Sequence, residues 1–226
     1  MAKTYAIAID GPAGAGKSTI AKALAKELGF RYVDTGAIYR TVAYFLDLLG
    51  ISPKDVDGVE RYIDELTIVI QYDEEGKQHM LMNGMDVTGE IRTQDISQKA
   101  SLVSAHAVVR EVLLDMQRDV AKHHNVIMDG RDIGTVVLPK ADVKIFLTAT
   151  PEVRAKRRYD ELIARGQKAN LDTILKEIKQ RDYQDTHREI APLKMARDSI
   201  KLDTSELDID GVLAEMKRII AGKIPV

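Results

Sequence analysis

Short apolar runs alternate with helix-forming segments along most of the chain. Five runs have the length and apolar character of buried strands, at residues 5–9, 30–33, 125–128, 143–148 and 199–202. Residues 19–28, 35–49 and 209–221 have helix-forming compositions, and Thr35 suits the N-cap of the second helix. Strands and helices that alternate in this way are typical of an α/β fold with a parallel sheet.

The pattern changes between residues 66 and 89. Residues 66–72 and 79–82 are two β-like runs joined by the turn-forming sequence DEEGK, and a second turn follows at Asn83-Gly84. Antiparallel strands inside a βα pattern predict an insert that is not part of the parallel sheet. Such an insert can close over a substrate, or it can be a decoration with no role in the site.

Three further helical regions are predicted between the insert and the last strand. The first follows residues 90–93 and reaches about residue 124, with a break near residues 104–107. The second begins at Thr150-Pro151 and ends at Arg165-Gly166. The third begins after Asn170 as N-cap and reaches about Ala191, just before a proline.

The clearest candidate chemistry lies at residues 11–18. Their sequence, GPAGAGKS, matches the phosphate-loop pattern G-x-x-x-x-G-K-[ST] at every fixed position, between a predicted strand and a predicted helix. Backbone N–H groups of such a loop and of the following helix N-terminus bind phosphate oxygens. We expect Lys17 to reach the β- and γ-phosphates and Ser18 to bind Mg²⁺. The residues expected to hold ATP in this loop are Gly11, Pro12, Ala13, Gly14, Ala15, Gly16, Lys17, Ser18 and Thr19.

Composition limits the alternatives. With 226 residues, 45% apolar and 30% charged, the chain is expected to form one soluble domain that carries at most a small insert. A net charge of −2 gives no reason to expect a nucleic-acid or membrane partner. The absence of cysteine excludes disulfides, thiolate catalysis and Cys-based zinc sites. No signal-peptide pattern precedes the first strand, so we expect a cytoplasmic location.

A second candidate site follows the strand at residues 125–128. Asp129 stands at the strand tip, the Walker-B arrangement in which a carboxylate orders Mg²⁺ or its water. The next residues, GRDIGT, place Arg131 and Asp132 in a loop at the edge of the sheet, where open α/β folds bind ligands. A purely structural loop is the alternative interpretation.

Arginines recur at helical spacing in the second half. Arg154, Arg157 and Arg158 share one helix face, which suits either a kinase lid that meets transferring phosphoryl oxygens or a solvated basic face. In the next helix Arg181, Asp185 and Arg188 also share a face. An ordinary surface pair explains Arg181 and Asp185 less well, because Arg preceding the acid is the less favourable helical order. Arg40, in the first turns of its helix, has a surface charge as its alternative role.

The chain resembles the bacterial cytidylate kinases, within the nucleoside-monophosphate kinase group of P-loop proteins. The resemblance covers essentially the whole sequence and rests on IDGPAGAGKST, DTGAIYR, GEIRT, DGRDIGTVVLP, TPEVRAKRR and RDYQDTHREIAPL. The phosphate loop alone defines a superfamily, whereas DGRDIGTVV together with RDYQDTHR makes the match specific.

This resemblance implies one P-loop kinase domain over residues 1–226, with a five-stranded parallel sheet flanked by helices. It also implies an antiparallel monophosphate-binding insert and a helical lid. On this basis we place the core at residues 1–62, 91–150 and 169–226, the insert at about 63–90, and the lid at about 151–168.

The resemblance also implies roles for side chains. Arg40, Arg131 and Arg188 would hold the acceptor phosphate, and Ser101, Arg110 and Asp132 would surround the cytosine. Arg181 and Asp185 would contact the ribose, with Thr35 as a further substrate contact. Arg157 and Arg158 would meet the phosphates or the adenine of ATP. The expected catalytic residues are Lys17, Arg131, Arg157, Arg158 and Arg188, and the expected metal ligands are Ser18 and Asp129.

The implied reaction is direct phosphoryl transfer from ATP to CMP or dCMP with Mg²⁺, by a monomer. The acceptor oxygen is already ionised at neutral pH, so no general base is required. A kinase of the same fold that acts on UMP, AMP or another small acceptor is the nearest alternative, although the pyrimidine-binding set argues against it. A GTP-dependent switch is a second alternative, but no Asn-Lys-x-Asp sequence for reading guanine occurs.

Overall fold

A five-stranded sheet forms the centre of the computed structural model, which describes residues 3–225. The strand order is β2-β6-β1-β7-β8, and every neighbouring pair is parallel. The strands are β1 (Ala6–Asp10), β2 (Arg31–Asp34), β6 (Val126–Gly130), β7 (Val143–Thr148) and β8 (Ile200–Asp203). Each begins within one residue of its predicted position, and the predicted α/β class is confirmed.

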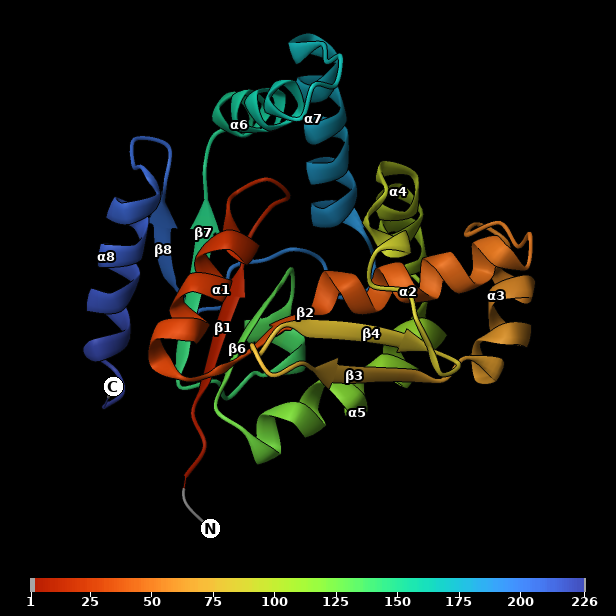
Figure 1. Ribbon diagram of the computed structural model, residues 1–226, viewed down its shortest axis with the longest axis horizontal. Coiled ribbons are helices and arrows are strands. Elements are labelled where there is room, and N and C mark those ends of the chain that lie inside the picture. The colour runs from red at the N-terminus through yellow and green to blue at the C-terminus, as the bar shows by residue number, and fades with distance from the viewer. Residues whose placement is uncertain (1–2, 226) are drawn as a thin grey trace.

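Helices cover both faces of this sheet (Figure 1). On one face α1 (Lys17–Leu28) and α8 (Ile209–Ala221) pack against Ile7 and Ile9 of β1. On the other face α2 (Thr35–Leu48) and α5 (Ala107–His123) enclose Ala8 and Met128. Because successive side chains of a strand point to opposite faces, the apolar run of β1 contributes to both cores.

The remaining elements stand around the carboxyl end of the sheet. α6 (Pro151–Ala164) and α7 (Leu171–His187) lie together above it (Figure 1). α4 (Gln94–Val103) precedes α5, and the predicted break near residues 104–107 separates the two. The short elements α3 (Val56–Tyr62), η1 (Ile63–Glu65), η2 (Glu90–Arg92) and the π-helix η3 (Ile133–Val137) were not predicted. No helix in residues 3–225 is long and apolar enough to cross a membrane.

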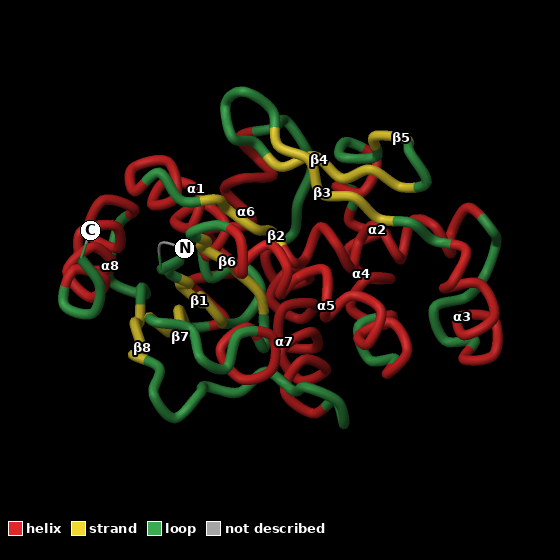
Figure 2. Tube along the Cα trace, turned by 90° about the horizontal axis from the view of Figure 1, so that it is seen from below, coloured by secondary structure: helices red, strands yellow, loops and turns green. Residues whose placement is uncertain are grey.

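The predicted antiparallel hairpin is confirmed, with one additional short strand. β3 (Ile68–Tyr72), β4 (Gln78–Met82) and β5 (Met85–Asp86) form a separate sheet beside α2, away from α8 (Figure 2). Side-chain hydrogen bonds from Tyr72 and Gln78 attach this sheet to β2. The Tyr72 hydroxyl donates to the Tyr32 carbonyl at 3.0 Å, and the Asp34 amide donates to Gln78 Oε1 at 2.8 Å.

Two predicted helix ends are wrong. Thr35 is the first residue of α2 and not its N-cap, because the Asp34 carboxylate accepts from the Ala37 amide and fills that role. α7 ends at His187 and does not reach Ala191. Arg188 is already extended, and the Leu193 amide donates back to the Asp185 carbonyl, so the chain turns away before Pro192.

Candidate active site

A cavity of about 850 Å³ opens at the carboxyl ends of β2 and β6. This volume lies in the range of small-molecule sites, and this edge is where open α/β sheets bind ligands. Every predicted site residue lines the cavity except Gly11 and Pro12 at the start of the phosphate loop. None of residues 63–90, all of which the structure describes, contributes to the lining.

The phosphate loop has the backbone that its glycines predict. Gly11 passes so close to β7 that a Cβ would lie 1.9 Å from the Leu147 carbonyl oxygen, so no larger residue fits. Gly16 is the N-cap of α1 in a left-handed conformation and offers no capping side chain. The first N–H groups of α1 therefore face the loop without a side-chain acceptor, as an anion site requires. Lys17 Nζ donates to the Pro12 carbonyl at 2.7 Å.

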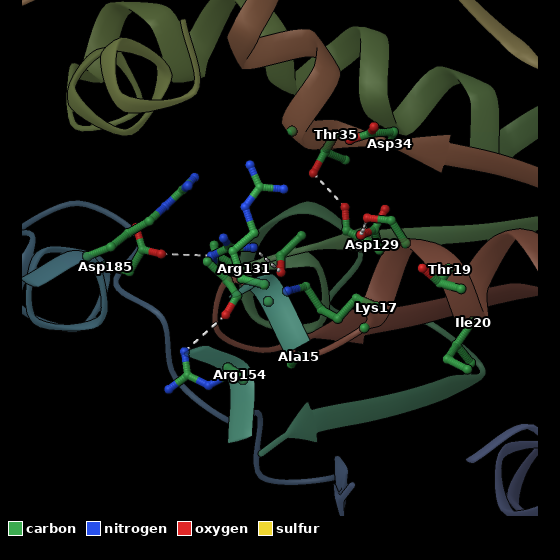
Figure 3. Close-up of a pocket in the computed structure, with 18 of the residues that line it drawn as sticks. Ala15, Lys17, Thr19, Ile20, Asp34, Thr35, Asp129, Arg131, Arg154 and Asp185 are labelled. Carbon is green, nitrogen blue, oxygen red and sulfur yellow. Dashed lines mark hydrogen bonds and ion pairs between the residues drawn. The ribbon is translucent and has the colours of Figure 1, made fainter. Parts of the chain in front are cut away.

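Three cations with little exposure line the cavity together with this loop, namely Lys17, Arg131 and Arg181. Figure 3 shows Lys17 and Arg131 directed into the same space. Burial, and next the charge of Arg131, lower the pKa of Lys17 well below its ordinary value. Burial and Arg131 also lower the pKa of Arg181 to about 10, and Arg181 Nε has no hydrogen-bond partner among the residues described. A polyanion bound between these groups would relieve their repulsion.

Ser18 and Asp129 lie together, as a magnesium site needs. Ser18 Oγ donates to Asp129 Oδ2 at 2.8 Å, and the Tyr32 hydroxyl donates to Asp129 Oδ1 at 2.8 Å. Burial, and next the charge of Asp34, raise the pKa of Asp129, so a cation here would stabilise its charge. Within residues 3–225 there is no cluster of three or more His, Cys, Asp or Glu that could hold a metal. The pair suits Mg²⁺, which takes few protein oxygens and relies on water and phosphate for the rest.

Asp34 organises the start of α2. Its carboxylate caps the helix, contacts Arg40 Nη2 at 3.0 Å and contacts Arg92 Nη1 at 3.4 Å. Burial opposes its ionisation, yet Arg40 and Arg92 hold the pKa of Asp34 below its ordinary value. Arg40 is thereby oriented at the cavity wall. Thr35 Oγ1 donates to the Asp129 carbonyl at 2.7 Å, which ties α2 to β6.

The opposite end of the cavity contains a network of Arg and Asp side chains. Asp132 accepts a hydrogen bond from Arg110 and lies 3.5 Å from Arg188 Nη2. Arg188 Nη1 donates to Ser104 Oγ at 3.1 Å, and Arg110 Nη1 donates to the Ser104 carbonyl at 3.2 Å. Ser101, one helical turn earlier, lines the same wall. Buried charges that are paired in this way have fixed positions, which a specific recognition site needs.

Asp185 connects α7 to the loop that follows β6. Arg131 Nε donates to Asp185 Oδ2 at 2.8 Å, and the Asp185 carboxylate is almost fully buried. Arg181, predicted to share its face with Asp185, also lines the cavity. Asp185 is thus paired with a residue distant in sequence, and the surface-pair interpretation of Arg181 and Asp185 is wrong.

The three arginines of α6 point to different places. Arg157 Nη2 donates to the Thr204 carbonyl at 2.6 Å, beside the part of the cavity lined by Leu207 and Ile209. Arg158 pairs with Glu161 at 2.8 Å. Arg154 is 2% exposed, donates to the Ala13 carbonyl at 3.0 Å and pairs with Asp182 of α7. The structure does not gather them on one phosphate position.

Sequence reasoning missed several residues that hold the site together. Asp34 lies inside the DTGAIYR segment, beside the predicted Thr35. Arg154 was part of the predicted arginine face, but its contacts with Ala13 and Asp182 were not predicted. Asp10 directly precedes the phosphate loop, and its carboxylate binds two backbone amides of η3. Their partners are far away in sequence, which no local pattern reveals.

Comparisons with known proteins agree on one family. A sequence model of the family described as cytidylate kinase matches residues 7–221. A cytidylate kinase from Ligilactobacillus salivarius is 48% identical over 220 residues, covering 97% of this chain and 98% of its own. One from Exiguobacterium sp. is 46% identical with the same two coverages.

A more distant solved structure, a shikimate kinase from Bacteroides thetaiotaomicron, aligns over 95% of this chain and 97% of its own at 16% identity. Its TM-score is 0.47, so it adds nothing to the assignment. The family match and the close relatives each span nearly the whole sequence, and both carry the same description. The chain is therefore a kinase that belongs to the cytidylate kinase family.

Proposed function

We propose that this kinase transfers the γ-phosphoryl group of ATP to CMP or dCMP, giving ADP and CDP or dCDP. Relatives named cytidylate kinase support the acceptor. The observation that carries the proposal is one cavity with two different ends. The phosphate loop lines one end, Arg110 and Asp132 line the other, and Lys17 and Arg131 stand between them. A monomer would be sufficient, because all the proposed contacts come from one chain.

The phosphate loop would hold ATP through its backbone N–H groups and the N-terminus of α1. Lys17 would exchange its hydrogen bond to the Pro12 carbonyl for the β- and γ-phosphates. Ser18 and Asp129 would hold Mg²⁺, which when bound would neutralise negative charge on the phosphates. The apolar wall at Leu207, Ile209 and Val212 would take the adenine.

Arg40, Arg131 and Arg188 would hold the acceptor phosphate. The acceptor oxygen is ionised at neutral pH, so the task of the protein is to bring two polyanions together in line. Arg is suited to this because its guanidinium stays charged and binds phosphate through two parallel hydrogen bonds. Transfer would be direct, because the ionised acceptor oxygen is itself the nucleophile.

The Asp132 and Arg110 pair would recognise the base. Cytosine has an exocyclic amine that donates to Asp132, and a ring nitrogen and a carbonyl that accept from Arg110. Uracil carries an acceptor in place of the amine and a donor in place of the accepting ring nitrogen. It would therefore place an acceptor against Asp132 and a donor against Arg110. A mispaired buried polar group costs about 1–3 kcal/mol, enough for tenfold discrimination or more.

The test is phosphoryl transfer by the purified chain with ATP and Mg²⁺ to CMP, dCMP, UMP and AMP. We expect CMP and dCMP to have the highest kcat/KM. A higher value for UMP or AMP would favour the alternative kinase. ATP binding with no transfer to any of the four would overturn the proposal.

A further inference from the structure

Asp10 is a buried carboxylate that has no part in the proposed transfer. It is the last residue of β1, is 2% exposed and does not line the cavity. Its Oδ1 accepts from the Ile133 amide and its Oδ2 from the Gly134 amide, each at 2.7 Å. Burial raises the pKa of Asp10 to about 6, and the two amide bonds oppose this rise because they stabilise the ionised carboxylate.

These two bonds hold the segment that carries the proposed recognition residues. In the sheet, Asp10 lies opposite Gly130, the last residue of β6. Its side chain then reaches the start of η3, three and four residues further on. The chain between these two attachments contains only Arg131 and Asp132. Asp10 thus fixes both ends of the short loop that places these two side chains in the cavity.

The far end of this segment is held by other groups. Arg118 donates to the carbonyls of Val136 and Val137 at 2.9 and 3.0 Å, and Lys144 donates to the Pro139 carbonyl at 2.7 Å. In the described part of the chain, no side chain except Asp10 accepts from the two amides at the near end. Loss of the carboxylate would leave two buried N–H groups without a partner next to Asp132.

We propose that Asp10 is a positioning residue for base recognition, which acts by holding the loop of Arg131 and Asp132 against β1. This inference rests on the proposed function, because it assigns to Asp132 the reading of cytosine. It predicts that a change at Asp10 alters the preference between CMP and UMP, although Asp10 touches neither nucleotide. A purely structural role would lower stability and leave that preference unchanged.

The main variant is Asp10→Asn, which keeps the size of the side chain but points an amide donor at a backbone donor. We expect the ratio of kcat/KM for CMP to that for UMP to fall about tenfold, the discrimination that one mispaired polar group supplies. KM for CMP should rise and KM for ATP should stay unchanged. The matched control is Asp142→Asn. In the wild-type chain, the Asp142 carboxylate accepts from the Ala6 amide at 2.9 Å, at the opposite end of β1. The control should keep the wild-type ratio.

A second variant, Gly134→Ala, perturbs the same contact without removing a charge. A Cβ there would lie 3.3 Å from Asp10 Oδ2 and 3.2 Å from Lys144 Cδ, so the Asp10 contact must shift slightly. We expect a smaller fall in the same ratio, and this variant decides the matter if Asp10→Asn does not fold. Thermal unfolding of each variant identifies the folded ones.

Two results would overturn the inference. One is a wild-type ratio in every folded variant. The other is an equal loss with CMP and UMP together with a raised KM for ATP, which would assign Asp10 to the phosphate loop. Failure of the proposed function has a different signature, since the wild-type protein would then transfer nothing to CMP. In that event, the affinities of each variant for CMP and UMP, measured by calorimetry, still show whether Asp10 affects the preference between the two.

Discussion

The donor and acceptor sides of the cavity are built in different ways. The donor side is one continuous loop and the helix that follows it, in which backbone N–H groups face the expected phosphates. The acceptor side takes side chains from α2, α5, α7 and the loop after β6. Arg188 and Ser104, which are hydrogen-bonded there, are 84 residues apart in sequence. A local sequence thus forms the donor side, whereas only the complete fold forms the acceptor side.

This difference has consequences for substitution. On the donor side, Lys17 adds a positive charge to a site otherwise made of backbone N–H groups. Its loss should therefore slow transfer to every acceptor alike. On the acceptor side, Arg and Asp are paired with each other, and removal of one partner leaves a largely buried charge alone. Substitutions there should therefore change acceptor affinity and base preference.

The largest effect should come from Lys17→Met. This change removes the charge that would meet the β- and γ-phosphates, and we expect kcat to fall about 10²–10³-fold because an electrostatic contact to the transition state is lost. The fall should be the same with CMP, dCMP and UMP. Steady-state kinetics with each acceptor measure it, and Lys26→Met on the exposed side of α1 is the control. A fall that depends on the acceptor would contradict the separation of the two sides.

Arg188→Ala tests the acceptor side. It removes a proposed phosphate contact and also one of the two cations beside Asp132. We expect kcat/KM for CMP to fall about 100-fold, mainly through KM, as for a buried charged contact. KM for ATP should hardly change. Exposed Arg197→Ala serves as the control, and an equal rise in both KM values would show that the two sides are not independent.

Asp132→Ala tests base recognition by itself. Without the carboxylate, the cytosine amine has no acceptor and uracil is no longer opposed there, so the preference for CMP over UMP should fall tenfold or more. Kinetics with both acceptors give this ratio. An unchanged ratio would remove Asp132 from base recognition while leaving the phosphate contacts intact.

The same contrast explains how much of the molecule was predictable from the sequence. The strands of the parallel sheet are short continuous apolar runs, and the phosphate loop is a motif with fixed spacing, so both were located without a structure. Asp129 and Arg131 were identified for a similar reason, because they follow a strand directly. These predictions depend on neighbours within a few residues.

Contacts between distant segments were not predictable in this way. Neither the Asp34 carboxylate bound to Arg92 nor the Arg154 guanidinium bound to Ala13 leaves a periodic signal in the sequence. The predicted end of α7 at Ala191 was wrong for a related reason. Pro192 limits how far a helix can extend, but the chain leaves the helix earlier, where Arg188 turns toward Asp132 and Ser104.

Gln78→Ala tests how the antiparallel sheet supports the acceptor side. Gln78 is buried and accepts from the Asp34 amide, so its loss should lower the free energy of unfolding by about 1–3 kcal/mol through an unpaired N–H group. KM for CMP should also rise, because Asp34 orients Arg40. Urea denaturation and kinetics measure the two effects. Gln71→Ala, at an exposed position of the same sheet, is the matched control.

The smallest effect should come from His79, which lies on the middle strand β4 and faces away from the side of Gln78. His79 Nδ1 contacts Asp86 Oδ2 at 2.8 Å and His79 Nε2 contacts Asp73 Oδ2 at 3.2 Å, and the bonds to Asp86 and next to Asp73 raise the pKa of His79 above 6.5. A raised folded-state pKa means that protonated His79 stabilises the fold below pH 6.5. That contribution disappears as the pH rises through the folded-state pKa.

We therefore expect Tm of the wild-type protein to fall slightly as the pH rises above 6.5, and this pH-dependent decrease to be weaker in His79→Gln. Calorimetry at a series of pH values measures the difference. The sheet is attached to β2 through Tyr72 and Gln78 and not through His79. KM for CMP should consequently be the same in His79→Gln as in the wild type. A changed KM would mean that the outward face of the sheet at His79 is coupled to the acceptor side, although no residue of this sheet lines the cavity.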